Sequence, residues 1–355
     1  MTGEDREVSS SGSTAGTDGD AADAARIPLA VAPPRGPSAR RAVALLALVT
    51  AAALIPSLGA PATLHGTGEA AAPGAGGIGL MRAVLFAALC IPAGEFFVAR
   101  LVRRVPGAPV ADLPRSLAPH AAGAGFVAAL VLASVVATGN LVPHRLSEID
   151  PGGLYRTRDG ALALLEVNGF LAAGLCALSR RPACRMWPPA AVAVAEALRA
   201  HPTTEHSPAL GSALTLVHLV CASLWAGGLL HVLRTVRHWR TDPRAGGALL
   251  GLYARGAAVL LALITATGLW SSLRRMPAHT VLDQLTTTAY GRTLLAKVLL
   301  VAVVALLALI ARIRLRRAAD PLAACAPANA EVALLGLVVA ASGLLTALPL
   351  PIRWS

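Results

Sequence analysis

Charged and aromatic residues are both scarce in this sequence. Asp, Glu, Lys and Arg make up 14% of the 355 residues and aromatic residues only 4%, whereas hydrophobic residues reach 55%. A soluble domain carries about 25% charged residues. Several apolar runs also exceed the ~18 residues that mark a transmembrane helix. The composition therefore excludes an ordinary soluble protein and predicts an all-α, polytopic membrane protein.

Catalytic motifs and paired cysteines are missing as well. The sequence contains no Walker loop, no GxSxG elbow, no HExxH pair and no GxGxxG placed between a strand and a helix. Its five cysteines include no CxxC pair, so neither a zinc ribbon nor a disulfide framework is indicated. We therefore expect no enzymatic activity and no ATPase within this chain.

The basic residues are almost all arginines, and Lys297 is the single lysine. A net charge of +12 is compatible with nucleic-acid binding, but the arginines stand in short clusters between apolar runs. The positive-inside rule places such clusters on the cytoplasmic side of a membrane. We therefore expect the lipid bilayer, not nucleic acid, to be the main partner.

Hydropathy and arginine clusters together predict about nine transmembrane spans in the cytoplasmic membrane, with the N-terminus in the cytoplasm and the C-terminus outside. The predicted spans are 42–58, 80–101, 118–136, 161–178, 187–200, 209–233, 256–272, 292–310 and 330–348. The span at 187–200 is short and begins Trp-Pro-Pro, so the alternative is eight spans.

Three regions are expected from composition and span order. Residues 1–41 are rich in Ser, Gly, Thr, Asp and Ala, and we expect a disordered cytoplasmic segment there. Residues 42–185 form an N-terminal membrane region of four helices, and residues 186–355 form a second membrane domain.

The stretch from Leu210 to Arg240 contains the strongest functional signal. His218, Cys221 and Trp225 lie at spacings of three and four residues, so they share one face of a helix. A polar residue deep in an apolar span is costly to insert and is a functional hypothesis by default. His218 is therefore interpreted as a ligand for a metal or haem, with Cys221 as a second soft ligand. A histidine bonded to a neighbouring helix is the structural alternative.

The predicted outer loops carry further candidate ligands. Imidazole and thioether groups suit copper better than magnesium or calcium. We expect an extracytoplasmic capture site from four residues: His201, His206, Met276 and His279. Solvated loop histidines are the alternative. Three glutamates within or near spans are candidates for pairing with a buried cation or for relaying protons: Glu95, Glu166 and Glu196.

From about His201 onward the chain resembles the copper resistance protein D (CopD) family of bacterial inner-membrane proteins. The pieces that carry the resemblance are, in order, the His201 segment, 216–219 (LVHL), 224–228 (LWAGG), 266–268 (ATG), 288–292 (TAYGR), 295–297 (LAK), Glu331 and 344–346 (LLT). It implies a helical membrane protein that moves copper across the inner membrane, with a periplasmic copper-binding partner of the CopC type. The resemblance implies that His218 is a copper ligand, with His201 beside it.

The sequence departs from the family pattern where Ala311 and Arg312 stand in place of the usual Asn before the basic run, and it has no methionine-rich outer segment. We expect copper transport, in the uptake direction, serving copper homeostasis and resistance. The alternative is a haem-binding membrane redox protein, because HemJ-type protoporphyrinogen oxidases look similar around His218 and the Trp-x-Gly-Gly piece. A non-transporting assembly or sensor partner is a third possibility.

Overall fold

The computed structural model describes residues 39–349 except 71, 140, 144, 180–181, 204–206, 277–278 and 318–324. The expected disorder of residues 1–41 falls almost entirely outside the described part. The chain divides into two units, Met1–Val43 and Ala44–Ser355, and the second contains all of the packing around the candidate site.

Most described residues are helical and none of them is in a strand, so the predicted all-α class is confirmed. The helices and short 3₁₀ turns run in this order: α1 (Ala39–Leu64), α2 (Ala75–Val102), α3 (Ala118–Ala137), η1 (Leu146–Glu148), α4 (Pro151–Arg156), α5 (Arg158–Leu178), η2 (Pro182–Arg185), α6 (Trp187–Arg199), α7 (Pro208–His238), α8 (Pro243–Arg275), α9 (Val281–Thr287), α10 (Ala289–Arg317) and α11 (Cys325–Leu345).

Six helices in the described part are long and apolar enough to cross a membrane: α2, α3, α5, α7, α8 and α10. The apolar described parts of α1 and α11, Thr50–Leu64 and Ala330–Leu345, are shorter. The fifth predicted span is α6, whose 13 residues extend about 20 Å at 1.5 Å per residue. That is shorter than a hydrocarbon core of about 30 Å. The predicted count of about nine spans is therefore not confirmed.

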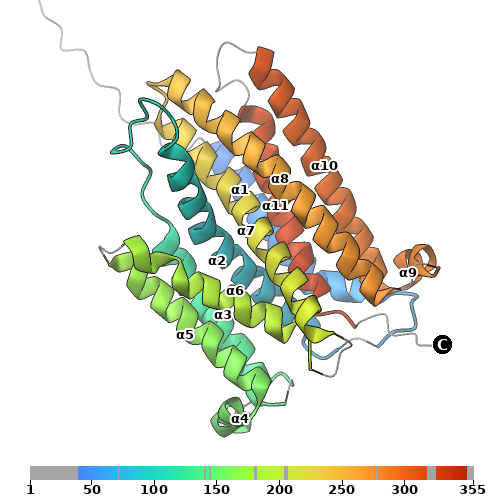
Figure 1. The fold of residues 1–355 in the computed structure, drawn as a ribbon. Coiled ribbons are helices and arrows are strands. Elements are labelled where there is room, and N and C mark those ends of the chain that lie inside the picture. The colour runs from blue at the N-terminus through green and yellow to red at the C-terminus, as the bar shows by residue number, and fades with distance from the viewer. Residues whose placement is uncertain are drawn as a thin grey trace, which may run out of the picture. The chain divides into compact units, whose positions relative to one another are not determined.

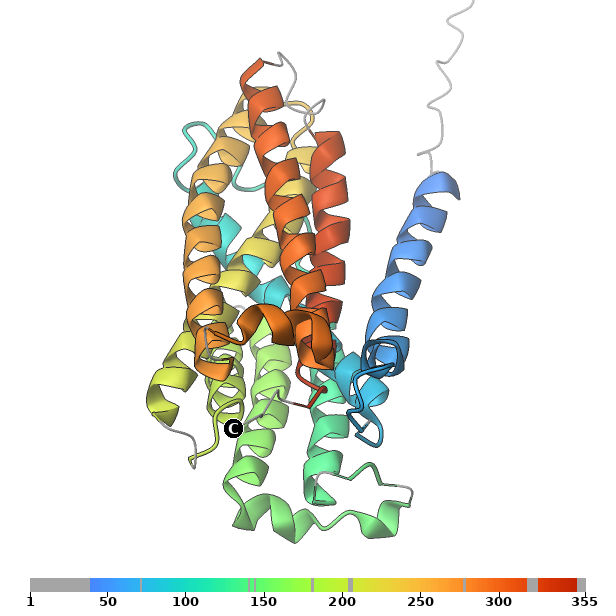
Figure 2. The same ribbon diagram turned by 90° about the vertical axis from the view of Figure 1, so that its right-hand side faces the viewer.

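Helix α2 is the centre of the second unit. It contacts α3, α6, α7, α8 and α11. On one side it packs with α3, α5 and α6 around Leu85, Leu89 and Phe170. On the other side it packs with α7 and α8 around Val98, Trp225 and Tyr253. Figures 1 and 2 show these two groups of helices on either side of α2.

Helices α2 and α7 run parallel and touch through their backbones. A Cβ atom added to Gly227 would lie 1.7 Å from the Cys90 carbonyl oxygen, and one added to Gly94 would lie 2.1 Å from the Gly227 carbonyl carbon. Small residues four apart allow such close approach of membrane helices, here Cys90 with Gly94 and Ser223 with Gly227. This contact fixes the register between the two helices.

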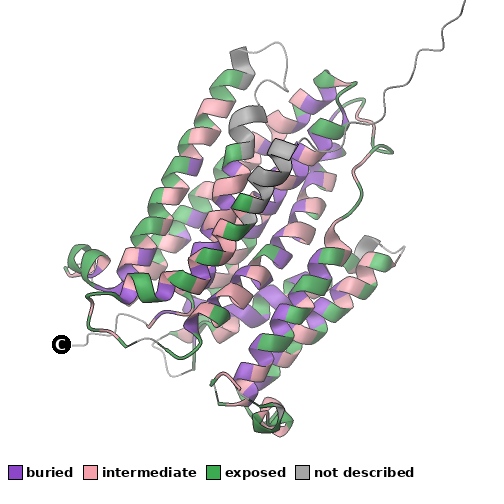
Figure 3. Cartoon of the chain, turned by 180° about the vertical axis from the view of Figure 1, so that it is seen from behind, coloured by how far each residue is buried: buried purple, intermediate pink, exposed green. Residues whose placement is uncertain are grey.

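The outward faces of the helices are apolar. On α10 the exposed large side chains include Leu295, Val298, Leu299, Val303 and Leu306, and Figure 3 shows exposed and half-buried residues along the outer faces of the helices. A soluble monomer rarely exposes apolar patches of this extent. These faces are what lipid would cover.

Candidate functional site

His218 lies on α7 and faces α8. Its Nδ1 atom is 3.0 Å from the Thr267 hydroxyl oxygen. A Cβ added to Gly268 would lie 3.4 Å from the Cε1 atom of His218, so the glycine lets the ring lie close to the α8 backbone. The sequence piece Ala-Thr-Gly at 266–268 is therefore the surface against which this histidine packs.

The hydrogen bonds of Thr267 assign the tautomer of His218. A threonine hydroxyl has one hydrogen to donate, and Thr267 Oγ1 lies 2.7 Å from the Leu263 carbonyl oxygen, which can only accept. Thr267 then accepts from the imidazole, which places the proton on Nδ1 and leaves the lone pair on Nε2. Metal-binding histidines commonly donate their other ring N–H to a neighbouring group in this way.

Lys297 of α10 interacts electrostatically with His218. Its side chain is half-buried. A positive charge close to the imidazole repels any cation that binds there. Three helices, α7, α8 and α10, therefore determine the chemistry around one histidine.

His201 is buried against the start of α7. Its Nε2 atom is 2.9 Å from the Thr215 hydroxyl oxygen, and its ring packs on Gly211, where an added Cβ would come within 2.5 Å of Nδ1. Thr215 precedes His218 by three residues, which is about 4.5 Å along the helix axis and about 60° around it. The structure thus brings His201 to the α7 face that leads to His218.

The other predicted ligands are not gathered with these two. Cys221 is buried in the apolar core one turn from His218, Met276 is completely buried, and His279 is exposed. His206 lies outside the described residues. Among the described residues no group of three or more His, Cys, Asp or Glu side chains could hold a metal ion. A capture site built from these residues stays a prediction.

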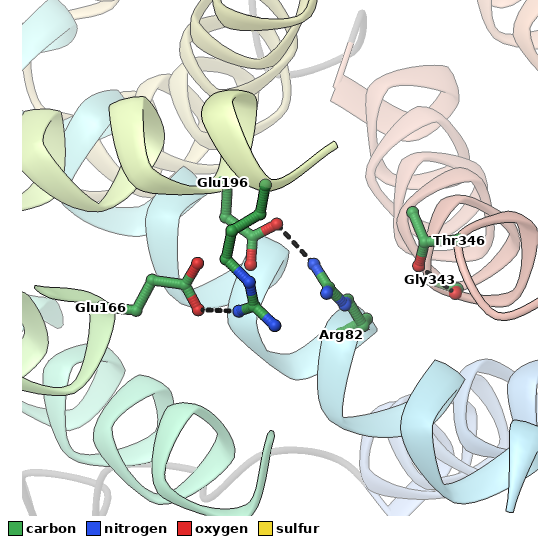
Figure 4. A network of polar contacts seen from close by, with 6 residues as sticks. Arg82, Glu166, Glu196, Gly343 and Thr346 are labelled. Carbon is green, nitrogen blue, oxygen red and sulfur yellow. Dashed lines mark hydrogen bonds and ion pairs between the residues drawn. The ribbon is translucent and has the colours of Figure 1, made fainter. Parts of the chain in front are cut away.

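A buried ion-pair network joins α2, α5 and α6. Arg82 contacts Glu196 at 2.5 Å, and Arg199 contacts Glu166 at 2.6 Å (Figure 4). Glu166 is 0% exposed and Glu196 is 4% exposed. Each has a second oxygen, Oε1, with no hydrogen-bond partner in the described part of the chain. The sequence pointed to the glutamates but not to the arginines, although Arg82 stands two residues inside a predicted span.

Glu95, the third predicted glutamate, has a different role. Its carboxylate accepts hydrogen bonds from the Ser116 hydroxyl at 2.5 Å and from the Leu117 backbone N–H at 2.6 Å. Leu117 is the residue that precedes α3, so the side chain satisfies free donors at a helix start, where negative charge is favourable. Glu95 thus fixes the loop between α2 and α3 to α2.

The comparison with protein families bears on α8, α9, α10 and α11. Residues 247–347 match the family model of copper resistance protein D. The CopD resemblance predicted from the sequence is confirmed for this part of the chain. The match covers less than half of the chain, and it includes Thr267, Gly268 and Lys297 but not His201 or His218. No curated protein and no solved structure matches the chain.

The CopD match and the six long apolar helices together indicate a multi-pass membrane protein. His218 lies on a helix outside the matched segment but packs against Thr267 and Gly268 within it. The CopD-like part therefore supplies the threonine and the glycine of this contact, and α7 supplies the histidine.

Proposed function

We propose that this chain carries copper ions across the cytoplasmic membrane, with His218 as the intramembrane ligand. The observation that supports this most directly is the hydrogen bond from His218 to Thr267, which leaves the Nε2 lone pair available within a CopD-like group of helices. Imidazole is a good copper ligand. No observation on the described residues favours the haem alternative.

The proposed route begins at His201 and continues along α7. From His201 an ion would pass to His218 and then to Cys221, one helical turn further on. Lys297 weakens cation binding at His218 by charge repulsion. A transport site must bind an ion weakly enough to release it. Lys297 would therefore favour release of the ion from His218.

The positions of the arginines indicate how the protein is oriented in the membrane. Many lie at the ends of α2, α7 and α10 and at the start of α8, and Figures 1 and 2 place these helix ends on one side of the unit, whereas Arg274 and Arg275 lie at the other end of α8. We infer that this side faces the cytoplasm. The His201 end would then face outward, where a copper-binding protein of the CopC type would deliver copper for uptake.

Replacing His218 with alanine tests the proposed ligand. Purified wild-type protein is expected to retain copper, and H218A to fall to background, because the central ligand of the proposed route is lost. The measurement is metal content and the visible spectrum of both proteins after exposure to Cu(I) or Cu(II). His238→Ala is the matched control, because His238 lies on the same helix but is exposed and paired with Asp112.

Cellular copper accumulation completes this experiment. Cells producing wild type and H238A should accumulate more copper than cells producing H218A. Equal copper binding and equal accumulation in H218A would refute the site. A Soret band that depends on His218 would instead move the protein to the haem class.

Replacing Thr267 with valine tests the positioning of His218. Valine keeps the shape of threonine but cannot accept the Nδ1–H bond. Loss of such a partner typically costs 10- to 100-fold in metal affinity. We expect copper titration of T267V to show a weaker site of unchanged stoichiometry. Thr265→Val, two residues away and exposed, should bind copper like wild type, and an affinity loss shared by both variants would argue against a specific role for Thr267.

A further inference from the structure

A cleft opens between α2, α3, α5, the start of α6 and the loop before α3, with His231 of α7 also in its lining. Its volume is about 780 Å³. Its lining runs along α2 from Ala88 to Arg103, the residue that follows this helix. These positions are 15 residues apart, or about 22 Å along the helix. The cleft is therefore long enough to run from the middle of a bilayer to its headgroup region.

The lining changes from apolar to basic along this length. Near Ala88 the walls include Phe170 of α5, and Pro92 and Phe96 follow along α2. Near the end of α2 the walls carry Arg100, Arg103 and, from the segment before α6, Arg185. All three arginines are exposed in the unit. An amphipathic ligand with an anionic end matches this order of surfaces.

The remaining polar groups of the cleft do not cancel the basic end. Glu95 is the one carboxylate among the described lining residues, so the three arginines leave a net positive charge, and its oxygens accept hydrogen bonds from Ser116 and Leu117. His231 is buried at its edge. Arg185 gives one hydrogen bond to the Ser179 carbonyl, and the Arg100 guanidinium lies 4.7 Å from the centre of the Phe96 ring. Both guanidinium groups retain further donors for a phosphate.

We propose that this cleft binds one anionic phospholipid, with its phosphate at Arg100, Arg103 and Arg185 and an acyl chain along α2 against Phe96 and Phe170. Basic pockets between transmembrane helices on the cytoplasmic side are suited to anionic headgroups. The lipid would fill the space that the short helix α6 leaves beside α2, and would join α2 to α5. The proposal does not depend on copper.

Native mass spectrometry of the full chain in detergent tests the site. Wild type is expected to bind one phosphatidylglycerol molecule at least tenfold more tightly than it binds phosphatidylcholine with the same acyl chains. The double variant Arg100→Gln with Arg103→Gln should lose this preference. Arg104→Gln is the matched control, since Arg104 is also exposed but does not line the cleft, and it should behave like wild type.

A second variant tests the apolar end. Ala177→Leu adds volume within the cleft and should weaken phosphatidylglycerol binding without removing a charge. The thermal unfolding temperature of each variant without added lipid shows whether it has folded. Equal retention of the two lipids by wild type, or unchanged preference in the double variant, would overturn the proposal. Equal stabilisation by glycerol phosphate alone would also overturn it, because no acyl chain would then be involved.

Discussion

Replacing Gly227 with alanine is expected to leave little folded protein. The new Cβ would lie 1.7 Å from the Cys90 carbonyl oxygen, which belongs to the backbone of α2 and cannot move aside as a side chain could. Overpacking typically lowers folding stability by about 1–3 kcal/mol. We expect a clash between two backbones to cost at least the upper value of this range. The measurement is the yield of monodisperse protein and its thermal unfolding temperature in detergent.

Gly251→Ala provides the control for this experiment. Gly251 is also a helical glycine, on α8, but an added Cβ there would meet nothing within 4 Å. Alanine is favoured over glycine in a helix by about 1 kcal/mol, so G251A should be as stable as wild type or more so. If G227A unfolds at the same temperature as G251A, the close contact between α2 and α7 is not present in the protein.

Removing Arg199 is expected to have the second large effect. Arg199→Met keeps an unbranched side chain but leaves Glu166, which is 0% exposed, without its cation. Breaking one side of a buried ion pair costs about 3–5 kcal/mol. Arg199→Met together with Glu166→Leu removes both charges and should recover much of that loss, since apolar replacement of a whole buried pair is often neutral.

An exposed ion pair provides the comparison. His238 and Asp112 lie 2.8 Å apart, with side chains 47% and 61% exposed. Such surface pairs contribute about 0–1 kcal/mol, so Asp112→Asn should change the unfolding temperature little. A double variant no more stable than R199M would mean that Arg199 acts through packing instead of through its charge.

The sequence predicted the long helices well, because hydropathy is a local property. The predicted span 118–136 corresponds to α3 at Ala118–Ala137, and the predicted span 161–178 lies within α5 at Arg158–Leu178. The fifth span was the weak point. Helix α6 has only 13 residues, packs against α5 and α7, and carries the charged residues Glu196 and Arg199 in addition to its apolar residues. Hydropathy alone did not distinguish this short packed helix from a transmembrane span.

The candidate site was predicted only in part. The helical spacing of His218 and Cys221 is visible in the sequence, but the hydrogen bond to Thr267 joins residues 49 positions apart. The pairing of Glu196 with Arg82 joins residues 114 apart. Periodicity cannot show which helices are neighbours, so these partners needed the structure. His231 of α7 is likewise buried beside residues of α2, a placement that the sequence alone does not show.

The glycine contact between α2 and α7 also limits how this protein can move. With no layer of side chains between them, neither helix can slide along the other without first separating, so the pair is expected to behave as one rigid body. Gly227 lies nine residues after His218, on the opposite side of α7. Access to the histidine from one membrane face and then the other would therefore depend on displacement of α8 and α10, while α7 stays stationary with α2.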